Sequence, residues 1–515
     1  MRRNTLTTAV LAGLTGLAGM ASVSHAVNVN PDGLGQVLLY PYYTARGGND
    51  TLISIVNTTE RGKAVKIRFI EAMNSREVLD FNIYMSPYDV WTAAVTEAAD
   101  GRGKMLTNDT TCTVPYIFEF ENSEQEFLTF ELNDGGPTDP ERTASGYIEV
   151  IEMGTMVPVP ASAPPATDDS IIPWVTKHVA GVPRDCDIPV LAWTQGSGLP
   201  WIVGDTNFGF DTTLGASGGL YGSASIINVA EGTMISYNAT ALDGFWEPGT
   251  TRHTEPDSLL PDLAAGNETR SFVFDNGRLQ ENTWSAGIFA VNATLTLDRL
   301  MNEYVTDDEL GARTEWVLTF PTKRFHTDAE GGYVLPNEPI EPFTRTWHIR
   351  ADNTLHLPCE DMEYRFWDRE ETEPAPELGP PTVSPTPPPG VAPVFDLCKE
   401  ANVVRFGSAT PDYTEVLKEP RRTGGFAKLG YVNFDLPYED GWVRFDLSDN
   451  VGPGPDRRLS VPATSGTDGR LFVEGMPVIG FQATTFTNGE LAGGVLSNYG
   501  GTFTHRGTRS FVRSN

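Results

Sequence analysis

Apolar and polar residues alternate with a period of two along several short segments of the chain. In Val65–Phe69 three apolar residues alternate with Lys66 and Arg68, and Leu79–Met85 has the same pattern. This alternation is typical of a strand with one buried face, so we predict that the charged residues face solvent. Thr51–Asn57 is more continuously apolar. We expect these three strands to form a meander in one antiparallel sheet.

Similar segments recur to the end of the chain. They begin at Gly146, Ser223, Thr314, Arg345, Gly430 and Gly441. The chain also has 51 glycines and 38 prolines, which favour many turns over long helices. No fixed-period repeat connects the segments. The pattern therefore predicts a mainly β protein built from antiparallel sandwiches.

One segment has the spacing of a helix instead. Leu297, Leu300, Met301 and Tyr304 fall at i, i+3, i+4 and i+7. Thr306–Glu309, which follows, has the form of a capping box that starts a second short helix. We predict a short helical crossover between β segments here.

Three tyrosines, Tyr40, Tyr42 and Tyr43, surround Pro41 near the N-terminus. Alternation places Tyr40 and Tyr42 on one face of a strand and Tyr43 on the other, so the three rings do not form one flat platform. Pro41 lacks a backbone N–H, which suits an edge strand or a bulge. We predict the first strand of a sandwich here rather than a ligand site.

The N-terminus has the pattern of a secretory signal peptide. Arg2 and Arg3 precede an uncharged stretch over residues 6–23, and Ser24-His25-Ala26 follows as a small-x-small cleavage pattern. This predicts a signal peptide over residues 1–26 and no transmembrane span after its removal. We expect a secreted protein at the extracellular surface or in the periplasm.

Length and charge narrow the possibilities further. A net charge of −31 repels phosphates and anionic lipids, so nucleic acid is excluded as a partner. A chain of 515 residues is too long for one ordinary core. We predict two antiparallel β-sandwich (Ig-like) domains with a short helical crossover and Pro-rich loops. The expected N-terminal domain spans residues 27–265, and the C-terminal one spans 266–515 with a Pro-rich loop at 371–393.

Four cysteines, Cys112, Cys186, Cys359 and Cys398, predict two disulfides in an exported chain. Three pairings are possible, and the sequential one fits separate domains best. A bond between Cys359 and Cys398 would make the second Pro-rich stretch a loop within one domain rather than a linker between domains. Zinc is disfavoured, because only His356 and Cys359 approach the spacing of a metal-ligand pair.

Catalytic motifs are nearly absent. Ser217 lies in a Gly-x-Ser-x-Gly pentamer, but the residues after it are typical of a strand and not of the helix that a nucleophile elbow needs. The histidines downstream of the signal peptide are scattered, and we expect them to be solvated or singly hydrogen-bonded. They are His178, His253, His326, His348, His356 and His505.

Carboxylates are too numerous for a catalytic pair to be chosen from spacing alone. Oxygen-rich loops from Asn133 and from Ser448 have the composition of calcium loops but not an established spacing, so ordinary acidic turns are the better interpretation. We therefore assign no catalytic, cofactor-binding or metal-binding residue. Structural calcium is the one cofactor left open.

Two segments, Gly33–Trp91 and Met301–Asp328, resemble a group of large exported bacterial surface or periplasmic β proteins of unknown role. The resemblance implies a secreted or surface-associated β protein and brings no catalytic residues. Our leading hypothesis is a non-enzymatic envelope or surface protein with a structural or binding role, whose partner is an envelope protein or a polysaccharide. The alternative is a secreted carbohydrate-active enzyme or carbohydrate-binding protein, because acidic loops, 10 Trp and 16 Tyr suit sugar rings.

Overall fold

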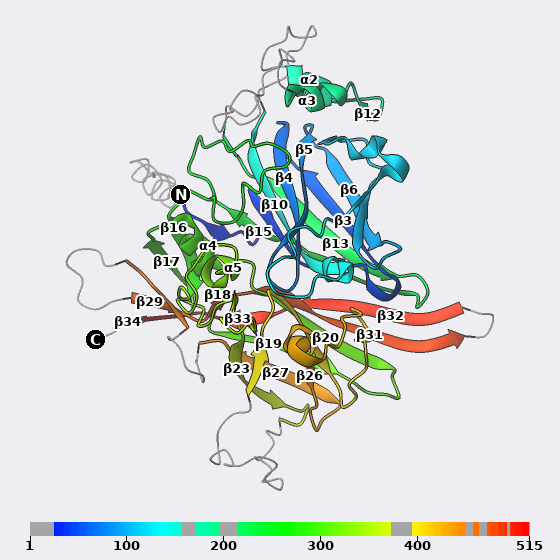
Figure 1. The fold of residues 1–515 in the computed structure, drawn as a ribbon, viewed down its shortest axis with the longest axis vertical. Helices are drawn as coiled ribbons and strands as arrows, with labels where there is room; N and C mark the ends of the chain where they lie inside the picture. The colour runs from blue at the N-terminus through cyan, green and yellow to red at the C-terminus, as the bar shows by residue number, and fades with distance from the viewer. Residues whose placement is uncertain are drawn as a thin grey trace, which may run out of the picture.

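The computed structural model describes residues 25–156, 171–194, 215–275, 277–371, 394–448, 457–462, 471–491 and 495–513 (Figure 1). The fold is mainly β, and its large sheets are built almost entirely from antiparallel pairs. The predicted signal peptide lies outside the described residues except for His25 and Ala26. None of the described helices has the length and apolar character needed to cross a bilayer.

Two sheets from the N-terminal half pack face to face. The seven-stranded sheet has the order β1 (Asn28–Val29), β15 (Thr240–Asp243), β2 (Val37–Thr44), β10 (Ser145–Thr155), β4 (Lys63–Glu71), β5 (Glu77–Met85) and β8 (Cys112–Val114). The six-stranded sheet has the order β14 (Thr233–Asn238), β13 (Leu220–Asn228), β3 (Asn49–Asn57), β6 (Val90–Glu97), β7 (Gly103–Leu106) and β9 (Glu124–Glu126). Their inner faces share one apolar core, in which the rings of Phe81 and Trp91 lie 5.8 Å apart.

Two five-stranded sheets come from the C-terminal half. The outer sheet has the order β24 (Val394–Leu397), β23 (Glu360–Trp367), β27 (Asp440–Asp446), β19 (Arg299–Val305) and β33 (Arg506–Thr508). The middle sheet has the order β26 (Val432–Phe434), β25 (Ala401–Phe406), β20 (Ala312–Thr319), β31 (Ile479–Leu491) and β32 (Val495–Thr504). The rings of Trp316 and Phe445 lie 5.1 Å apart in the core between the two sheets.

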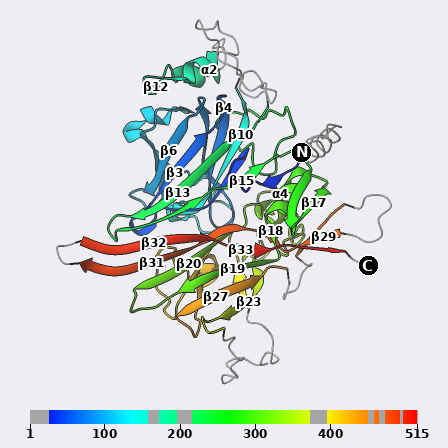
Figure 2. The ribbon, with the colours of Figure 1, turned by 180° about the vertical axis from the view of Figure 1, so that it is seen from behind.

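The middle sheet is apolar on both faces. Trp316 packs into the core that it shares with the outer sheet, whereas Val317 and Phe481 belong to the core of the N-terminal sheets. Phe481 stacks on Tyr237 of β14 with ring centroids 4.6 Å apart. Figures 1 and 2 show the long β31–β32 hairpin between the two pairs of sheets. The two halves of the chain are therefore joined by a continuous core.

Short elements complete the fold. The α-helices are α2 (Ile171–Thr176), α3 (Asp187–Ala192), α4 (Gly287–Leu295) and α5 (Arg324–Thr327). The 3-10 turns are η1 (Arg46–Gly48), η2 (Ile117–Glu119), η3 (Glu121–Ser123), η4 (Pro140–Ala144) and η5 (Gly424–Leu429). Small sheets pair β11 (His178–Val179) with β12 (Val182–Pro183), β16 (Arg270–Asp275) with β17 (Arg278–Thr283), β18 (Thr296–Leu297) with β30 (Met476–Pro477), β21 (His348–Ile349) with β22 (Leu355–His356), and β29 (Leu471–Glu474) with β28 (Arg458–Ser460) and β34 (Ser510–Arg513).

The predicted helix at Leu297–Tyr304 is wrong. These residues form β18 and β19, and the only helix nearby is α4, which ends at Leu295. In β19, Leu300 and Tyr304 point into the core while Arg299 and Glu303 are exposed. The spacing of apolar residues is also compatible with strand alternation, and pairing with β27 decides in favour of the strand.

The predicted meander is correct in part. β4 and β5 pair as expected, but β3 lies in the six-stranded sheet, where it pairs with β13 and β6. The turn after β2 therefore carries the chain from one sheet to the other. Gly47 and Gly48 in this turn have φ values of 58° and 83°, which glycine adopts without strain.

The expectation that the charged side chains of β4 face solvent is wrong. Lys66 and Arg68 are fully buried, because the loop over residues 252–265 covers this face of the seven-stranded sheet. The Lys66 ammonium donates to Asp80 at 2.8 Å and to backbone carbonyls of that loop, including that of Glu255 at 2.8 Å. The alternation correctly predicts strands, but the second face is covered by polar contacts rather than by water.

The tyrosine cluster lies in β2, in the interior of the seven-stranded sheet, and all its residues are buried. Tyr43 pairs with Gly146 and Tyr40 with Ile148, so Pro41 and Tyr42 together oppose Tyr147. This is the bulge that Pro41 predicts, and because β15 pairs only with Val37–Leu39, Pro41 also lies where β2 has a neighbour on one side only. The first strand of the chain is β1, so β2 is the second.

The disulfides join Cys112 to Cys186 and Cys359 to Cys398, which is the sequential pairing. β23 and β24, on either side of the Pro-rich stretch, pair with each other in one sheet. The two ends of the stretch therefore belong to one sheet, as the loop interpretation predicts, and not to separate domains. Its residues 372–393 lie outside the described part of the chain. The domain boundary at residue 265 falls between β15 and β16 and stays a prediction.

Candidate functional site

A cleft of about 1320 Å³ opens beside the outer face of the seven-stranded sheet. Its walls come from β4, the turn before β5, the loops over residues 131–133 and 252–265, and the segment from α5 to Tyr333. Its charged side chains are Arg68, Arg76, Glu77, Glu131, Arg252, Asp262, Arg324, Asp328 and Glu330. Because both halves of the chain contribute, the cleft exists only in the assembled fold.

Arg68 forms the floor of the cleft and is fully buried. Its Nε donates to Glu77 Oε2 at 2.5 Å, and its Nη1 donates to Glu149 Oε2. Glu149 lies directly opposite Arg68 on the neighbouring strand β10. Burial raises the pKa of Glu149, an effect that Arg68 opposes. This guanidinium is therefore held in place by two carboxylates before any ligand binds.

Arg324, in the first turn of α5, forms the wall opposite the sheet. Its guanidinium donates to Ser75 O at 3.1 Å and to Asp262 Oδ2 at 3.1 Å. Phe325 and Tyr333 flank it, with ring centroids 4.6 Å and 5.6 Å from Arg324 Cζ. The Nε of Arg324 is buried and has no hydrogen-bond partner in the protein. This wall thus presents an unused donor beside an aromatic ring.

Arg76 connects the turn before β5 to the acidic end of the cleft. It lies 3.3 Å from Asp134 and 3.4 Å from Asp328. Burial raises the pKa of Asp328, and the nearby Arg76 guanidinium opposes this increase. Asp134 also binds the buried Arg142 through both carboxylate oxygens, and this contact helps to lower the pKa of Asp134 to about 2 against the effect of burial.

The mouth of the cleft is lined by exposed apolar and aromatic side chains as well as by charged ones. Leu259 and Leu260 are 56% and 51% exposed, and Tyr333 is 41% exposed. Arg252 is also exposed, and its guanidinium donates to the carbonyl of its neighbour Thr251 at 3.1 Å. A ligand entering the cleft therefore passes apolar and aromatic side chains before it reaches the ionic floor.

His253 forms part of the same wall but is not a proton carrier. Its Nε2 lies 2.8 Å from the hydroxyl of Tyr84, and its ring lies 5.0 Å from that of Trp193. Burial lowers the pKa of His253 to about 3. The imidazole is therefore neutral at physiological pH and packs as an aromatic residue.

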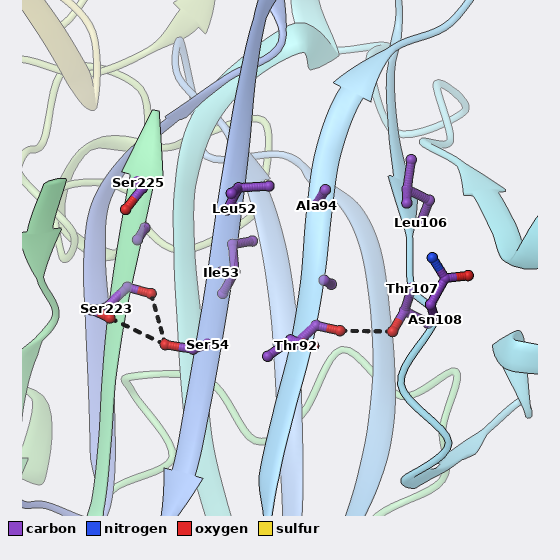
Figure 3. A pocket seen from close by; sticks show the side chains of 12 residues that line it. Leu52, Ile53, Ser54, Thr92, Ala94, Leu106, Thr107, Asn108, Ser223 and Ser225 are labelled. Carbon is purple, nitrogen blue, oxygen red and sulfur yellow. Dashed lines mark hydrogen bonds between the residues drawn. The ribbon is translucent and has the colours of Figure 1, made fainter. Parts of the chain in front are cut away.

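A second, shallower hollow of about 370 Å³ lies on the outer face of the six-stranded sheet (Figure 3). Its lining is small and uncharged, and Ser54 of β3 bonds Ser223 of β13 at its floor. Thr92 on the other side accepts a hydrogen bond from Thr107 through its backbone carbonyl. Leu52 rises beside these residues and is 42% exposed.

Ser217 does not lie in either cavity. Its hydroxyl is 2.9 Å from Lys63 Nζ, and Lys63 also pairs with Glu152 at 2.7 Å. The same Glu152 carboxylate accepts the backbone N–H groups of Ser217 and Gly218. An ammonium that donates to a carboxylate does not accept the serine proton, and β13 follows instead of a helix. The arrangement anchors a turn.

The six histidines are spread over the structure. His348 and His356 are cross-strand partners in β21 and β22, with stacked rings 4.7 Å apart. His326 is buried against Asn292 at 2.6 Å, and burial lowers its pKa to about 4. The expectation of solvated or singly hydrogen-bonded imidazoles fits His326, but it is wrong for His505, whose Nδ1 lies 3.1 Å from Asn302 Nδ2 and whose Nε2 lies 2.9 Å from Val317 O.

The loop from Asn133 binds a cation, but that cation is a guanidinium. Arg142 and Arg76 both contact the Asp134 carboxylate. The second candidate calcium loop falls largely on residues 449–456, outside the described residues. Within the described part of the chain, no three His, Cys, Asp or Glu side chains are placed to hold a metal ion.

Sequence reasoning did not identify the cleft. Lys66 and Arg68 were assigned to a solvated face, and Arg324 and Asp262 carried no motif. A usable signal is that Arg68 and Glu149 belong to strands that pair, so opposite charges share one face. The contribution of α5 is invisible in the sequence because it depends on tertiary contacts.

Comparison of the chain with family models, with curated proteins and with solved structures found no match in any of the three. The function is therefore inferred from the geometry and charge of the cleft.

Proposed function

We propose that this protein is a non-enzymatic, secreted protein of the cell envelope or cell surface with a binding role, and that the cleft is its ligand site. The observation that carries the proposal is the orphaned Nε of Arg324 in a cleft whose other buried charges are already paired. A buried donor without a partner costs free energy, about 1–3 kcal/mol, unless a ligand or water satisfies it. The cleft is prepared to bind a polar molecule without rearranging its floor.

The charges of the lining indicate the class of ligand. Four arginines face five carboxylates, so the cleft has almost no net charge. A neutral molecule with many hydroxyl groups suits such a lining, because each hydroxyl both donates to carboxylates and accepts from guanidinium groups. Tyr333, 41% exposed at the mouth, offers a ring on which a sugar face can pack. We propose a polysaccharide or oligosaccharide of the envelope as the ligand.

The same contacts favour binding over catalysis. Asp262 is engaged by Arg324, and Asp328 by Arg76. Carboxylate oxygens that already accept hydrogen bonds from a guanidinium are less available to take a proton from a substrate. Ser217 lies outside the cleft and anchors a turn.

We further propose that each pair of sheets is an Ig-like sandwich and that the protein acts outside the cytoplasm. The two disulfides support an oxidising compartment, and the signal-peptide pattern supports export. The resemblance of Gly33–Trp91 and Met301–Asp328 to exported β proteins agrees with this location.

The test is a glycan array followed by calorimetry on the mature protein. Arg252→Ala removes an exposed guanidinium of the cleft with little effect on stability, and we expect at least about tenfold weaker binding of the array hit. The matched control is Arg278→Ala, which removes an exposed arginine of β17 that does not line the cleft. Absence of any glycan hit, or equal losses in both variants, would contradict the proposal.

A reducing-sugar assay on the same hits distinguishes the enzymatic alternative. Binding without release of reducing ends supports the binding role. Steady release that is lost in Asp262→Asn would replace it with a carbohydrate-active enzyme.

A further inference from the structure

The outer face of the six-stranded sheet carries a regular pattern of side chains. Three cross-strand rows are defined by the pairing of β13, β3 and β6. The rows are Ser225–Leu52–Ala94, Ser223–Ser54–Thr92 and Tyr221–Val56–Val90. The first two rows line the hollow in Figure 3, and the third row follows along the strands, beyond the residues that line it.

These rows contain no charged residue, although the chain has a net charge of −31. Charged residues lie at the margins of the face: Asp50 on β3, Lys104 on β7, and Asp109, whose carboxylate accepts from the backbone N–H of Thr92 at 3.0 Å. The exposed apolar side chains include Leu52 at 42%, Val90 at 45% and Met234 at 56%. A face whose central rows are uncharged and partly apolar, on a strongly acidic protein, is typical of an interaction surface.

The shape of this face allows it to pack against the same face of a second copy of the protein. In a face-to-face arrangement about a twofold axis, the ridge of Tyr221, Val56 and Val90 of one copy can enter the hollow of the other. Two acidic molecules repel each other least where the approaching surfaces lack charge. At about 3.4 Å per residue and about 4.8 Å between strands, β14, β13, β3 and β6 together cover about 520 Å² per copy. The total of about 1040 Å² for two copies just reaches the roughly 1000 Å² that a specific interface needs.

We propose that this face is the contact surface of a homodimer, in which the six-stranded sheets of two copies stack on each other. The proposal is independent of the cleft, which lies beside the other N-terminal sheet. Because the acidic remainder of each copy opposes association, the dimer becomes tighter as salt screens that repulsion.

The experiment is sedimentation velocity of the mature protein from 1 to 100 µM, at low and at high salt. Leu52→Glu places a charge in the contact and should raise the dimer dissociation constant at least about tenfold. The matched control is Leu279→Glu, at a strand leucine of β17 that is 52% exposed and away from the face. Ser54→Arg serves as a second variant, and the melting temperature of each protein confirms folding.

A wild-type dimer that is lost in Leu52→Glu and Ser54→Arg but kept in Leu279→Glu supports the proposal. A wild-type monomer at every concentration and salt overturns it, and so does a dimer that persists in both face variants. Binding of a neutral polysaccharide to a monomeric protein through Leu52 would also overturn it, by assigning the face to another occupant.

Discussion

Replacing Tyr42 with Phe tests whether the contact between the two halves of the chain is energetically important. The Tyr42 hydroxyl donates to Glu419 Oε2 at 2.9 Å, across the boundary between the N-terminal and C-terminal sheets. Burial raises the pKa of Glu419, but Lys399, Arg46 and the Tyr42 hydroxyl outweigh this effect and lower it to about 2. The acceptor is therefore a buried carboxylate.

The magnitude follows from the charge of that acceptor. A hydrogen bond to a charged group contributes about 1.5–3 kcal/mol to folding, so Tyr42→Phe should cost about 2 kcal/mol at pH 7. Tyr42→Ala also removes a fully buried ring and should cost about 3–5 kcal/mol. The lowered pKa of Glu419 contributes stability above the ordinary value of 4.5, and this is lost as the pH falls from 4.5 to about 2. The penalty of Tyr42→Phe should shrink over the same range.

Tyr40→Phe is the matched control. Tyr40 is equally buried, but its hydroxyl donates to the neutral carbonyl of Ser54 at 2.7 Å. Its loss should cost only about 1 kcal/mol, independent of pH between 2 and 7. Urea denaturation of both variants at pH 7 and pH 3 measures the difference. A Tyr42→Phe penalty that is below about 0.5 kcal/mol, or equal to that of Tyr40→Phe at both pH values, would refute the reasoning.

Four further predictions follow. Burial raises the pKa of Glu400 from 4.5 to about 8, so its contribution to stability is complete below pH 4.5 and is lost as the pH rises towards 8. Glu400→Gln should therefore weaken the dependence of the melting temperature on pH, measured from pH 5 to 9. Replacing Cys359 and Cys398 together with Ala opens a loop of about 40 residues and should cost up to about 4 kcal/mol in urea denaturation. Arg142→Met leaves the buried Glu71 without its guanidinium partner and leaves Asp134 with Arg76 alone, so it should cost about 3–5 kcal/mol, and a loss below about 1 kcal/mol would contradict the buried ion pair. Ser217 should not be labelled by a fluorophosphonate, as intact mass measures.

Prediction from sequence was most successful for the local elements. The alternation in Val65–Phe69 and Leu79–Met85 lies in β4 and β5, and the bulge at Pro41 is present. These features depend on short-range properties, namely side-chain period and the missing N–H of proline. They can therefore be inferred without knowing which strands pair.

The errors concern what covers each strand. Lys66 and Arg68 have the pattern of solvated residues, but a loop nearly 200 positions later covers them. Tyr304 fits a helix and a strand equally well until β27 provides its partner. The cleft was missed for the same reason, because Arg324 and Asp262 are brought to the sheet by tertiary packing.

The middle sheet imposes an order on biosynthesis. Its strand β31 begins at Ile479, yet Phe481 of that strand fills the core of the N-terminal sheets. A nascent chain therefore retains an uncovered apolar surface until almost its whole length has emerged. We expect completion of the fold to be a late, post-translational event.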